Sequence, residues 1–432
     1  MKAGFRRLLA SVFARQARRL IKRHHLIVVA VCGSVGKTST RSAIVTVLRQ
    51  KLKTQAIHHP GYNSELGLPL SIFEMRTPDS LINPFAWAWR LIQAEIIINR
   101  PYAGQVLVLE LGTDHPGEID RYLRYLQPDV GVITAITPEH MENFESLDAV
   151  AAEELKIVSA CKYLLASASI PAHYKKKFIG VHPHHDYYGT TKHDTYQIAV
   201  SQDDPVSGMT CTISKSGHKV IKDLSIGLFG ESAALSALAA FAVADHLGLS
   251  SQTISKGLGK LKPVAGRMQV MKGENDSILI DDTYNSSPAA VEASLQALYA
   301  TSPRGRRIAI LGSMNELGAE SKTYHEQIGP AAAGVDLLLT VGDLANKYLG
   351  PSAVKAGLDP TRFQPADSPI AAAEFLRLTL HPGDIVLIKG SQNQVFLEEA
   401  VKRLLADKSD QSRLVRQSKS WLKIKSKQFS DI

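Results

Sequence analysis

One stretch near the start of the chain constrains the fold more than any other. Residues 26–32 are apolar and rich in β-branched side chains, and they are followed by Gly33, Gly36, Lys37 and Thr38. This pattern predicts a strand buried on both faces, and the apolar spacing after Thr38 predicts a helix. A strand, a glycine turn and a helix start form a cradle in which backbone N–H groups face an anion. The sequence therefore predicts a nucleotide phosphate site.

The residue types in this loop match the parts of a nucleotide. Lys37 is expected to reach the terminal phosphates, and the Thr38 hydroxyl is expected to ligate Mg²⁺. The spacing is shorter than usual, because Val31 stands where the common pattern has its first glycine. The strand–turn–helix context still supports the assignment, so the predicted nucleotide-binding residues are Gly33, Ser34, Val35, Gly36, Lys37, Thr38 and Ser39.

The net charge of +9 over 432 residues is concentrated at the two ends. Residues 1–25 hold eight Lys or Arg and no acid, and residues 408–432 hold seven and two Asp. The body between them therefore carries −4. A nucleic-acid binder would spread basic charge over a folded face, so no nucleic-acid partner is expected. Basic termini suit an acidic membrane surface or simple solubility.

The cysteine spacing and the hydropathy pattern indicate the cellular compartment of the protein. Cys32, Cys161 and Cys211 have neither paired nor metal-ligand spacing, so free thiols in a reducing cytoplasm are expected. No apolar run reaches the ~18–20 residues of a membrane span, and the N-terminus is a poor secretion signal. A cytoplasmic protein is predicted, with peripheral contact at the inner membrane face left open.

The overall pattern predicts an α/β protein. Residues 1–25 read as a basic amphipathic helix, and packing on the domain behind it is favoured over lying on a membrane. Residues 26–265 predict a central phosphate-loop domain with a mostly parallel sheet and a β-rich antiparallel flap at about 182–226. Residues 266–407 predict a smaller Rossmann-like α/β domain. The basic tail, 408–432, is expected to be mostly disordered.

Further polar residues follow predicted strands. Glu110 ends one, where a magnesium ligand or a salt-bridged carboxylate is expected. His140 follows another, with a metal or phosphate role and a purely structural one both open. Asp281 and Asp282 begin a polar cluster that suits a nucleotide approaching from the second domain, although such clusters are also ordinary helix caps. Lys389 and Ser391 follow a further strand and are predicted to hold an anionic substrate group.

Ordered motifs spread over about residues 27–405 resemble those of the Mur ligases, the ATP-dependent amide-forming enzymes of peptidoglycan synthesis. The resemblance is closest to the branch that adds D-alanyl-D-alanine to a UDP-N-acetylmuramoyl-tripeptide. The motifs that carry it lie at 33–40, 63–70, 110–112, 117–119, 140–144, 266–268, 281–285, 311–318 and 389–391.

The resemblance implies a two-step reaction with ATP and Mg²⁺. ATP phosphorylates a substrate carboxylate, and an amine then attacks the acyl phosphate to give an amide. By position, Thr38 and Glu110 correspond to ligands of one magnesium ion and His140 to a ligand of another. Residues implied to contact the nucleotide, some of them from the closing C-terminal domain, are Asn63, Arg267, Asp282, Tyr284 and Asn285.

The chain departs from the family pattern in three places. The family's carbamoylated lysine aligns with Glu154, and Lys156 would face away because two helical residues turn by ~200°. We therefore hypothesise that Glu154 supplies the negative charge and is catalytic together with Lys37 and His140. The family's His-Asn at a helix start is replaced by Ser232 and Ala233.

The third departure is that only about 25 residues precede the phosphate-loop strand, which leaves no counterpart in this sequence for the family's uridine-nucleotide-binding domain. Either the substrate is held in another way, for example with a partner protein, or it is not a uridine-linked precursor.

The predicted function is an ATP-dependent carboxylate–amine ligase of cell-wall assembly and cell shape. Its substrates would be a cell-wall precursor peptide and D-alanyl-D-alanine. One alternative is the same chemistry on a folate or polyamide acid, and another is a non-catalytic nucleotide-binding scaffold.

Overall fold

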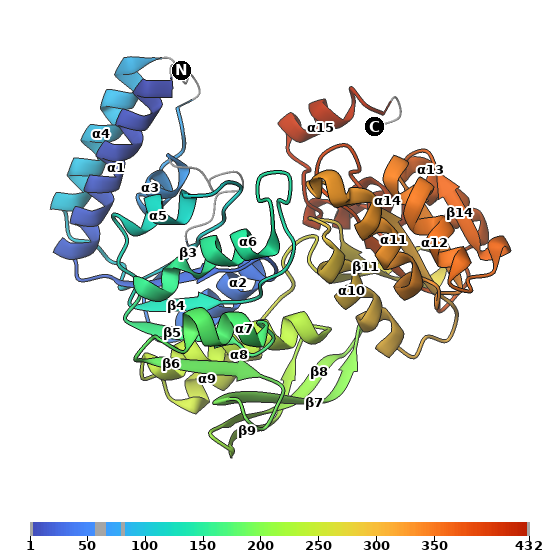
Figure 1. Ribbon diagram of the computed structural model, residues 1–432, viewed down its shortest axis with the longest axis horizontal. Coiled ribbons are helices and arrows are strands. Elements are labelled where there is room, and N and C mark those ends of the chain that lie inside the picture. Colours follow the sequence, from blue (N-terminus) through green and yellow to red (C-terminus); the bar gives the residue numbers. More distant parts are fainter. Residues whose placement is uncertain (1–2, 57–65, 79–82, 430–432) are drawn as a thin grey trace.

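Two separate sheets, one in each half of the chain, organise the molecule (Figure 1). The computed structural model describes residues 3–56, 66–78 and 83–429. Both sheets are mostly parallel and carry helices on both faces, so the predicted α/β class is confirmed.

The first sheet has nine strands in the order β2-β3-β1-β4-β5-β6-β7-β8-β9. Neighbouring strands run parallel as far as β7, and β8 and β9 are antiparallel. The strands are β1 (Ile27–Cys32), β2 (Thr54–Ala56), β3 (Val106–Glu110), β4 (Val130–Ile133), β5 (Tyr163–Ser167), β6 (His185–Gly189), β7 (Tyr196–Asp204), β8 (Gly208–Lys215) and β9 (His218–Ile226).

Helices cover both faces of this sheet because its central strands are apolar on both sides. In β1, Val28 and Ala30 belong to one core cluster, and Val29 and Val31 belong to the other. The first cluster includes side chains of α1 (Ala3–Arg23), α3 (Gly67–Ile72), α4 (Pro84–Asn99), α5 (Glu118–Leu123), α6 (Leu147–Glu154) and α7 (Ala172–Tyr174). The second includes α2 (Lys37–Leu48), α8 (Glu231–His246) and α9 (Ser251–Leu258).

The expected β-rich flap is an extension of the sheet. β7 pairs in parallel with β6 at Tyr188 and Tyr196, so hydrogen bonding continues into the antiparallel strands without a break. Ile198 and Ile213 are buried in the same cluster as the α8 side chains. The parallel pairing of β6 with β7 was not evident from the polar composition of this segment.

The second sheet has six strands in the order β10-β11-β15-β12-β13-β14, and β10 alone is antiparallel to its neighbour. Its strands are β10 (Gln269–Gly273), β11 (Ser277–Asp282), β12 (Arg307–Gly312), β13 (Leu337–Val341), β14 (Phe363–Ala366) and β15 (Ile385–Lys389). One core cluster joins it to α10 (Pro288–Ala300), α11 (Ser321–Ala332) and α12 (Gly350–Lys355), and the other to α13 (Pro369–Thr379) and α14 (Glu398–Leu404).

The N-terminal helix packs on the first domain. Leu9, Phe13, Ala17 and Leu20 of α1 are buried in the core cluster of that domain. Among the described residues, no helix is both long enough and apolar enough to cross a membrane.

The C-terminal tail differs from expectation. Residues 408–429, which were predicted to be mostly disordered, contain a 3₁₀ turn (Lys408–Arg413) and α15 (Lys419–Lys425). Arg416 and Lys425 form ion pairs with Glu398 of α14, and Lys425 also pairs with Glu399. The composition argument failed because these basic side chains find buried carboxylate partners on another element.

Candidate active site

The phosphate loop is built where β1 ends and α2 begins. Gly33 and Gly36 have φ of +118° and +87°, a region that favours glycine. A Cβ on Gly33 would lie 2.5 Å from Oγ1 of Thr134, so this position has no room for a side chain. The loop thus follows the tight path that points backbone N–H groups at an anion.

Lys37, the first residue of α2, faces three carboxylates. Its Nζ lies 3.1 Å from the carbonyl oxygen of Ser34 and 3.3 Å from Oε2 of Glu139. Burial alone would lower the pKa of Lys37, but the charges of Glu139, Glu154 and Glu110 outweigh burial and raise it. Lys37 is therefore a fixed cation at the mouth of the phosphate loop.

Thr38 and Glu110 meet beside the loop. Thr38 Oγ1 donates to Glu110 Oε1 at 2.9 Å, and Arg41 Nε lies 3.5 Å from Glu110 Oε2. Glu110 ends β3, which pairs in parallel with β1, so both strands deliver their carboxyl ends to the same edge of the sheet.

Glu154 closes the inner side of the loop. The side chain is 1% exposed, and Oε2 accepts a hydrogen bond of 2.7 Å from the backbone N–H of Gly33. Burial raises the pKa of Glu154 to about 7 against the opposing effect of Lys37. Lys156 points elsewhere, to Asp120 at 2.6 Å and Glu153 at 2.7 Å.

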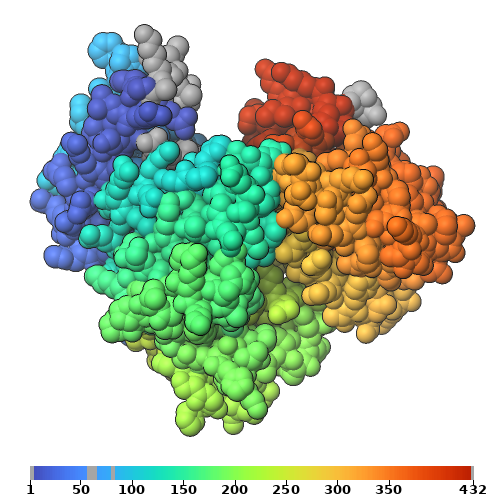
Figure 2. All heavy atoms as spheres, in the orientation of Figure 1, coloured from blue at the N-terminus to red at the C-terminus, as the bar shows by residue number. Residues whose placement is uncertain are grey.

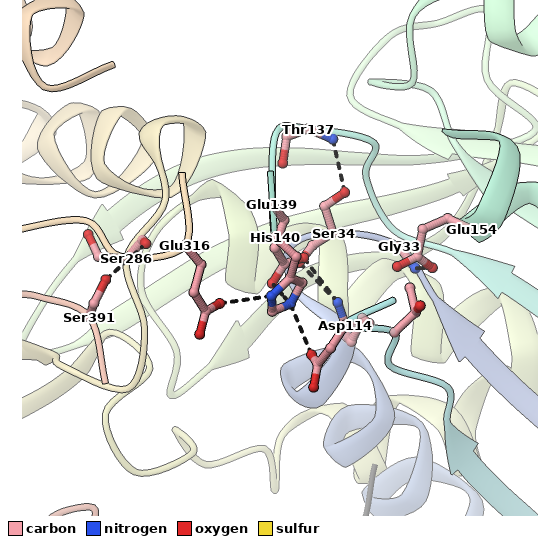
Figure 3. A network of polar contacts seen from close by, with 12 residues as sticks. Gly33, Ser34, Asp114, Thr137, Glu139, His140, Glu154, Ser286, Glu316 and Ser391 are labelled. Carbon is pink, nitrogen blue, oxygen red and sulfur yellow. Dashed lines mark hydrogen bonds and ion pairs between the residues drawn. The ribbon is translucent and has the colours of Figure 1, made fainter. Parts of the chain in front are cut away.

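His140 links the two domains (Figure 3). Its Nδ1 lies 2.8 Å from Oε2 of Glu316, and its Nε2 faces Asp114 at 3.4 Å and Glu139 at 3.6 Å. Burial alone would lower the pKa of His140, but the hydrogen bond that its ring donates to Glu316 and the nearby carboxylates raise it, which favours the protonated ring. The backbone N–H of Glu142 also donates to the carbonyl oxygen of Glu316 at 3.3 Å.

The second domain contributes a buried ion pair. Asp282 ends β11 and Lys389 ends β15, and these residues are neighbours in the register of the two strands. Lys389 Nζ lies 2.6 Å from Oδ2 of Asp282 and 3.0 Å from the carbonyl oxygen of Asn285. Asp282 Oδ1 accepts from the backbone N–H of Met268 at 3.1 Å, so the carboxylate holds both the lysine and the start of this domain.

Arg267 reaches across to the phosphate loop. Its Nη2 lies 3.4 Å from Thr38 Oγ1, and its guanidinium stacks on the ring of Tyr284 with Cζ 4.2 Å from the centroid. Arg267 and Glu316 therefore both bring the second domain to the nucleotide side of the first.

These elements enclose a cleft with a volume of about 770 Å³, counting the part open to solvent. Figure 2 shows the two domains meeting along one seam, with a notch between the N-terminal helices and the C-terminal tail. Polar residues lining the cleft include Ser34, Gly36, Ser39, Glu139, Ser232, Arg267, Asp282, Asn285, Ser286 and Lys389.

Comparison with known proteins identifies the family. The family model described as "Mur ligase middle domain" matches residues 92–244, and the model "Mur ligase, glutamate ligase domain" matches residues 266–392. The UDP-N-acetylmuramoyl-tripeptide–D-alanyl-D-alanine ligase of Synechocystis sp. is 30% identical over 403 residues, which cover 89% of this chain and 76% of the relative. The chain belongs to the Mur ligase family. It is an ATP-dependent ligase.

A second curated relative and a solved structure are also similar to this chain. The enzyme of the same name from Bacillus subtilis is 27% identical over 393 residues, covering 88% of this Mur ligase and 76% of the relative. The solved structure of MurF from Thermotoga maritima in complex with ADP has a TM-score of 0.74 at 23% identity. The alignment covers 91% of this chain and 83% of the MurF chain. At this level of identity, the likeness supports the fold.

The structure brings some of the predicted site residues into the lining of the cleft and leaves others out of it. Among the predicted site residues, Ser34, Val35, Gly36 and Ser39 line the cleft together with Arg267, Asp282, Asn285 and Lys389. The lining does not include Gly33, Lys37, Thr38, Glu110, His140, Glu154 or Tyr284. Asn63 lies outside the described residues. Ser391 is not among the lining residues, because its Oγ accepts from the N–H of Asn315 and donates to the carbonyl oxygen of Ser286. Ser391 thus ties two loops behind the cleft.

Sequence reasoning missed three charged partners in this Mur ligase. Arg41 supports Glu110, Glu139 faces Lys37, and Glu316 pairs with His140. Glu139 carried a local signal, since it directly precedes His140, and Glu316 lies within the motif at 311–318.

The donor set of the phosphate loop fits magnesium. Mg²⁺ in nucleotide sites is commonly held by one or two protein oxygens together with phosphate oxygens, and Thr38 and Glu110 offer a hydroxyl and a carboxylate side by side. Among the described residues, no group of three or more His, Cys, Asp and Glu side chains is arranged to hold a metal ion alone.

The folded tail braces the nucleotide side of the second domain. Arg416 donates to the carbonyl oxygens of Thr283 at 2.5 Å and Tyr284 at 3.1 Å, and it pairs with buried Glu398 at 2.9 Å. Tyr284 is the ring on which Arg267 stacks, so the tail fixes the backbone beneath an active-site contact.

Replacing Arg416 with alanine is expected to lower the free energy of unfolding by about 2 kcal/mol, because it removes one partner of a buried ion pair while Lys425 still neutralises Glu398. The KM for ATP should rise as Tyr284 loses its support. Thermal unfolding and steady-state kinetics measure both effects.

Arg413→Ala is the matched control, because Arg413 forms only an exposed pair with Asp410. Equal behaviour of the two variants would contradict the bracing role.

Proposed function

We propose that this Mur ligase joins the free carboxylate of a UDP-N-acetylmuramoyl-tripeptide to the amine of D-alanyl-D-alanine. The observation that carries the proposal is the cleft in which the phosphate loop of one domain faces Arg267 and the Asp282–Lys389 pair of the other. The names of the curated relatives support this choice of substrates.

In the first step a carboxylate oxygen attacks the γ-phosphorus of ATP, the bond to the bridging oxygen breaks, and ADP leaves. The transition state spreads negative charge over the transferred group. Lys37 supplies a fixed positive charge where that group would lie, and the loop N–H groups add oriented dipoles. A phosphate would replace Glu139 as the partner of Lys37.

In the second step the amine attacks the acyl carbon, and phosphate leaves as the amide forms. An acyl phosphate hydrolyses easily, so water must be excluded while the amine binds. The contacts of Arg267 with Thr38 and of His140 with Glu316 favour a closed arrangement of the domains. Closure of this kind is a common means of excluding water.

Magnesium would be held by Thr38 and Glu110. The family resemblance implies a second ion at His140, whose ring would have to lose the proton that its carboxylate neighbours favour. Bound there, Mg²⁺ supplies charge neutralisation to the phosphates. Glu154 is proposed to supply the negative charge that the family draws from a modified lysine, and in this structure it acts on the loop through Gly33.

Nucleotide contacts are proposed for Asn63, Tyr284 and Asn285. Lys389 is proposed to attract an anionic group of the substrate, with Asp282 holding its ammonium in place. Ser391 then has a positioning role, since its hydroxyl is used between Ser286 and Asn315.

Three further statements, on the protein partner and the cellular location of this Mur ligase, are proposals. A partner protein would hold the uridine-nucleotide end of the acid. The enzyme would work in the cytoplasm, where ATP is available. Its basic N-terminal segment would touch the inner membrane face.

Phosphate release from Mg·ATP tests the substrate assignment. We expect release only when the UDP-linked tripeptide and D-alanyl-D-alanine are both present, because each step needs its own reactant. A product mass equal to the two substrates less one water would establish the amide.

Two results would overturn the assignment. Release with a folate or polyamide acid in place of the tripeptide would favour the same chemistry on another substrate. Tight ATP binding with no turnover on any acid would favour a nucleotide-binding scaffold.

A further inference from the structure

Helix α4 is apolar on two opposite faces. Its inner residues Trp87, Ala94 and Ile98 are buried in the first domain. Its outer residues are Phe85, Trp89, Ile92 and Ile96, which are 84%, 54%, 51% and 38% exposed. Their 4-3-4 spacing places them in one stripe along the helix. A continuous apolar surface of this kind on a soluble domain usually marks an interaction site.

Helix α1 lies beside α4 and adds positive charge. The two helices run in the same direction, with Phe13 packed on Trp87, Gln16 bonded to the carbonyl oxygen of Leu91, and Arg19 paired with Glu95 at 2.6 Å. The only acid of α4 is therefore neutralised. Leu8 extends the apolar surface at 61% exposure.

The charge on α1 has one sign. Its 21 residues contain no acid and seven basic side chains: Arg6, Arg7, Arg15, Arg18, Arg19, Lys22 and Arg23. All seven are exposed. Figure 1 shows the α1–α4 pair standing at one end of the molecule, away from the second domain.

We propose that the outer surface of the α1–α4 pair, formed by Leu8, the α4 stripe and the basic side chains of α1, docks on an anionic phospholipid membrane. Aromatic and aliphatic side chains enter the headgroup boundary of a bilayer, where tryptophan is favoured. Arginine and lysine beside them are attracted to acidic headgroups. Neither helix crosses the bilayer, and the pair lies along its surface.

The positive charge of the α1–α4 surface makes other binding partners less suitable. A second copy of this chain would bring seven basic residues of one α1 near the seven of another, which is repulsive. The basic C-terminal tail has fewer exposed basic side chains than α1, because Arg416 and Lys425 are turned inward to Glu398. The inference extends the proposed peripheral contact by naming its surface, and it does not depend on which substrates are joined.

Sedimentation of the full-length protein with vesicles tests the proposal. We expect binding to phosphatidylcholine vesicles containing phosphatidylglycerol to be at least about tenfold stronger than to phosphatidylcholine alone, and to weaken with salt. Trp89 fluorescence should shift to shorter wavelength as its ring leaves water.

Two pairs of variants separate the contributions of the apolar and the basic side chains to vesicle binding. The double substitution Phe85→Ser, Trp89→Ser should weaken vesicle binding about tenfold or more. Leu378→Ser is its matched control, since Leu378 is 88% exposed on the other domain. Arg6→Gln with Arg7→Gln should remove much of the preference for acidic lipid, whereas Lys419→Gln with Lys423→Gln in the tail should not.

Equal binding by the stripe variant and its control would overturn the proposal. So would an absence of binding to acidic vesicles, or a protein that sediments as a dimer until Trp89 is replaced. Vesicle binding needs no turnover, so failure here is distinguishable from failure of the ligase assignment.

Discussion

Lys37→Met is expected to reduce turnover by about 10³-fold or more, the largest effect of any single substitution considered. The methionine keeps the volume of the side chain but removes a cation held between Ser34 and Glu139 at the phosphate loop. Phosphate release under saturating substrates measures the loss, and calorimetric titration with Mg·ATP measures the accompanying loss of affinity.

The matched control is Lys162→Met. Lys162 is also a lysine of the first domain paired with a carboxylate, Asp129, but its side chain is 76% exposed, whereas that of Lys37 is 12% exposed. This variant should retain full turnover, since exposed ion pairs contribute little. If Lys37→Met kept most of its activity while Lys162→Met did the same, the phosphate loop would not carry the reaction.

Local pattern was enough to predict the phosphate loop. The apolar run before Gly33, the two glycines with positive φ, and the helix start at Lys37 are neighbours in sequence, so their physics is local. The placement of Glu110 beside Thr38 could be predicted in one further step, because the carboxyl ends of adjacent parallel strands share an edge of the sheet.

Contacts between distant segments were beyond such reasoning. His140 and Glu316 are more than 170 residues apart in the chain, and only the packing of the two domains brings them to 2.8 Å. The tail illustrates the same limit: its composition is that of a disordered segment, yet Arg416 is held by Glu398.

Glu154→Gln is expected to make the protein more stable and less active. The folded carboxyl group holds its proton up to a pKa of about 7, whereas in the unfolded chain it ionises near the ordinary 4.5. Between these values the folded state binds more protons, so the free energy of unfolding falls as pH rises. Above the pKa of Glu154 in the folded state, the free energy of unfolding has fallen by its full amount, about 3 kcal/mol.

A glutamine at this position cannot ionise, and it still accepts the hydrogen bond from Gly33. The variant should therefore match the wild type near pH 5 and exceed it by up to about 3 kcal/mol near pH 8. Thermal unfolding with chelator and without nucleotide measures this difference. Turnover should fall by about 10²-fold, because the negative charge beside the phosphate loop is lost.

The adjacent residue provides the control. Glu153 is equally buried, but its two oxygens accept from the N–H groups of Gly117 and Ile119, so the amide of a glutamine would face a donor. Glu153→Gln should lose about 1–3 kcal/mol. A Glu154→Gln protein that is no more stable than the wild type at alkaline pH would refute the raised pKa. One with undiminished turnover would refute the catalytic role. A gain in stability together with a loss of activity would mean that this chain keeps a buried charge at the loop because the reaction requires it.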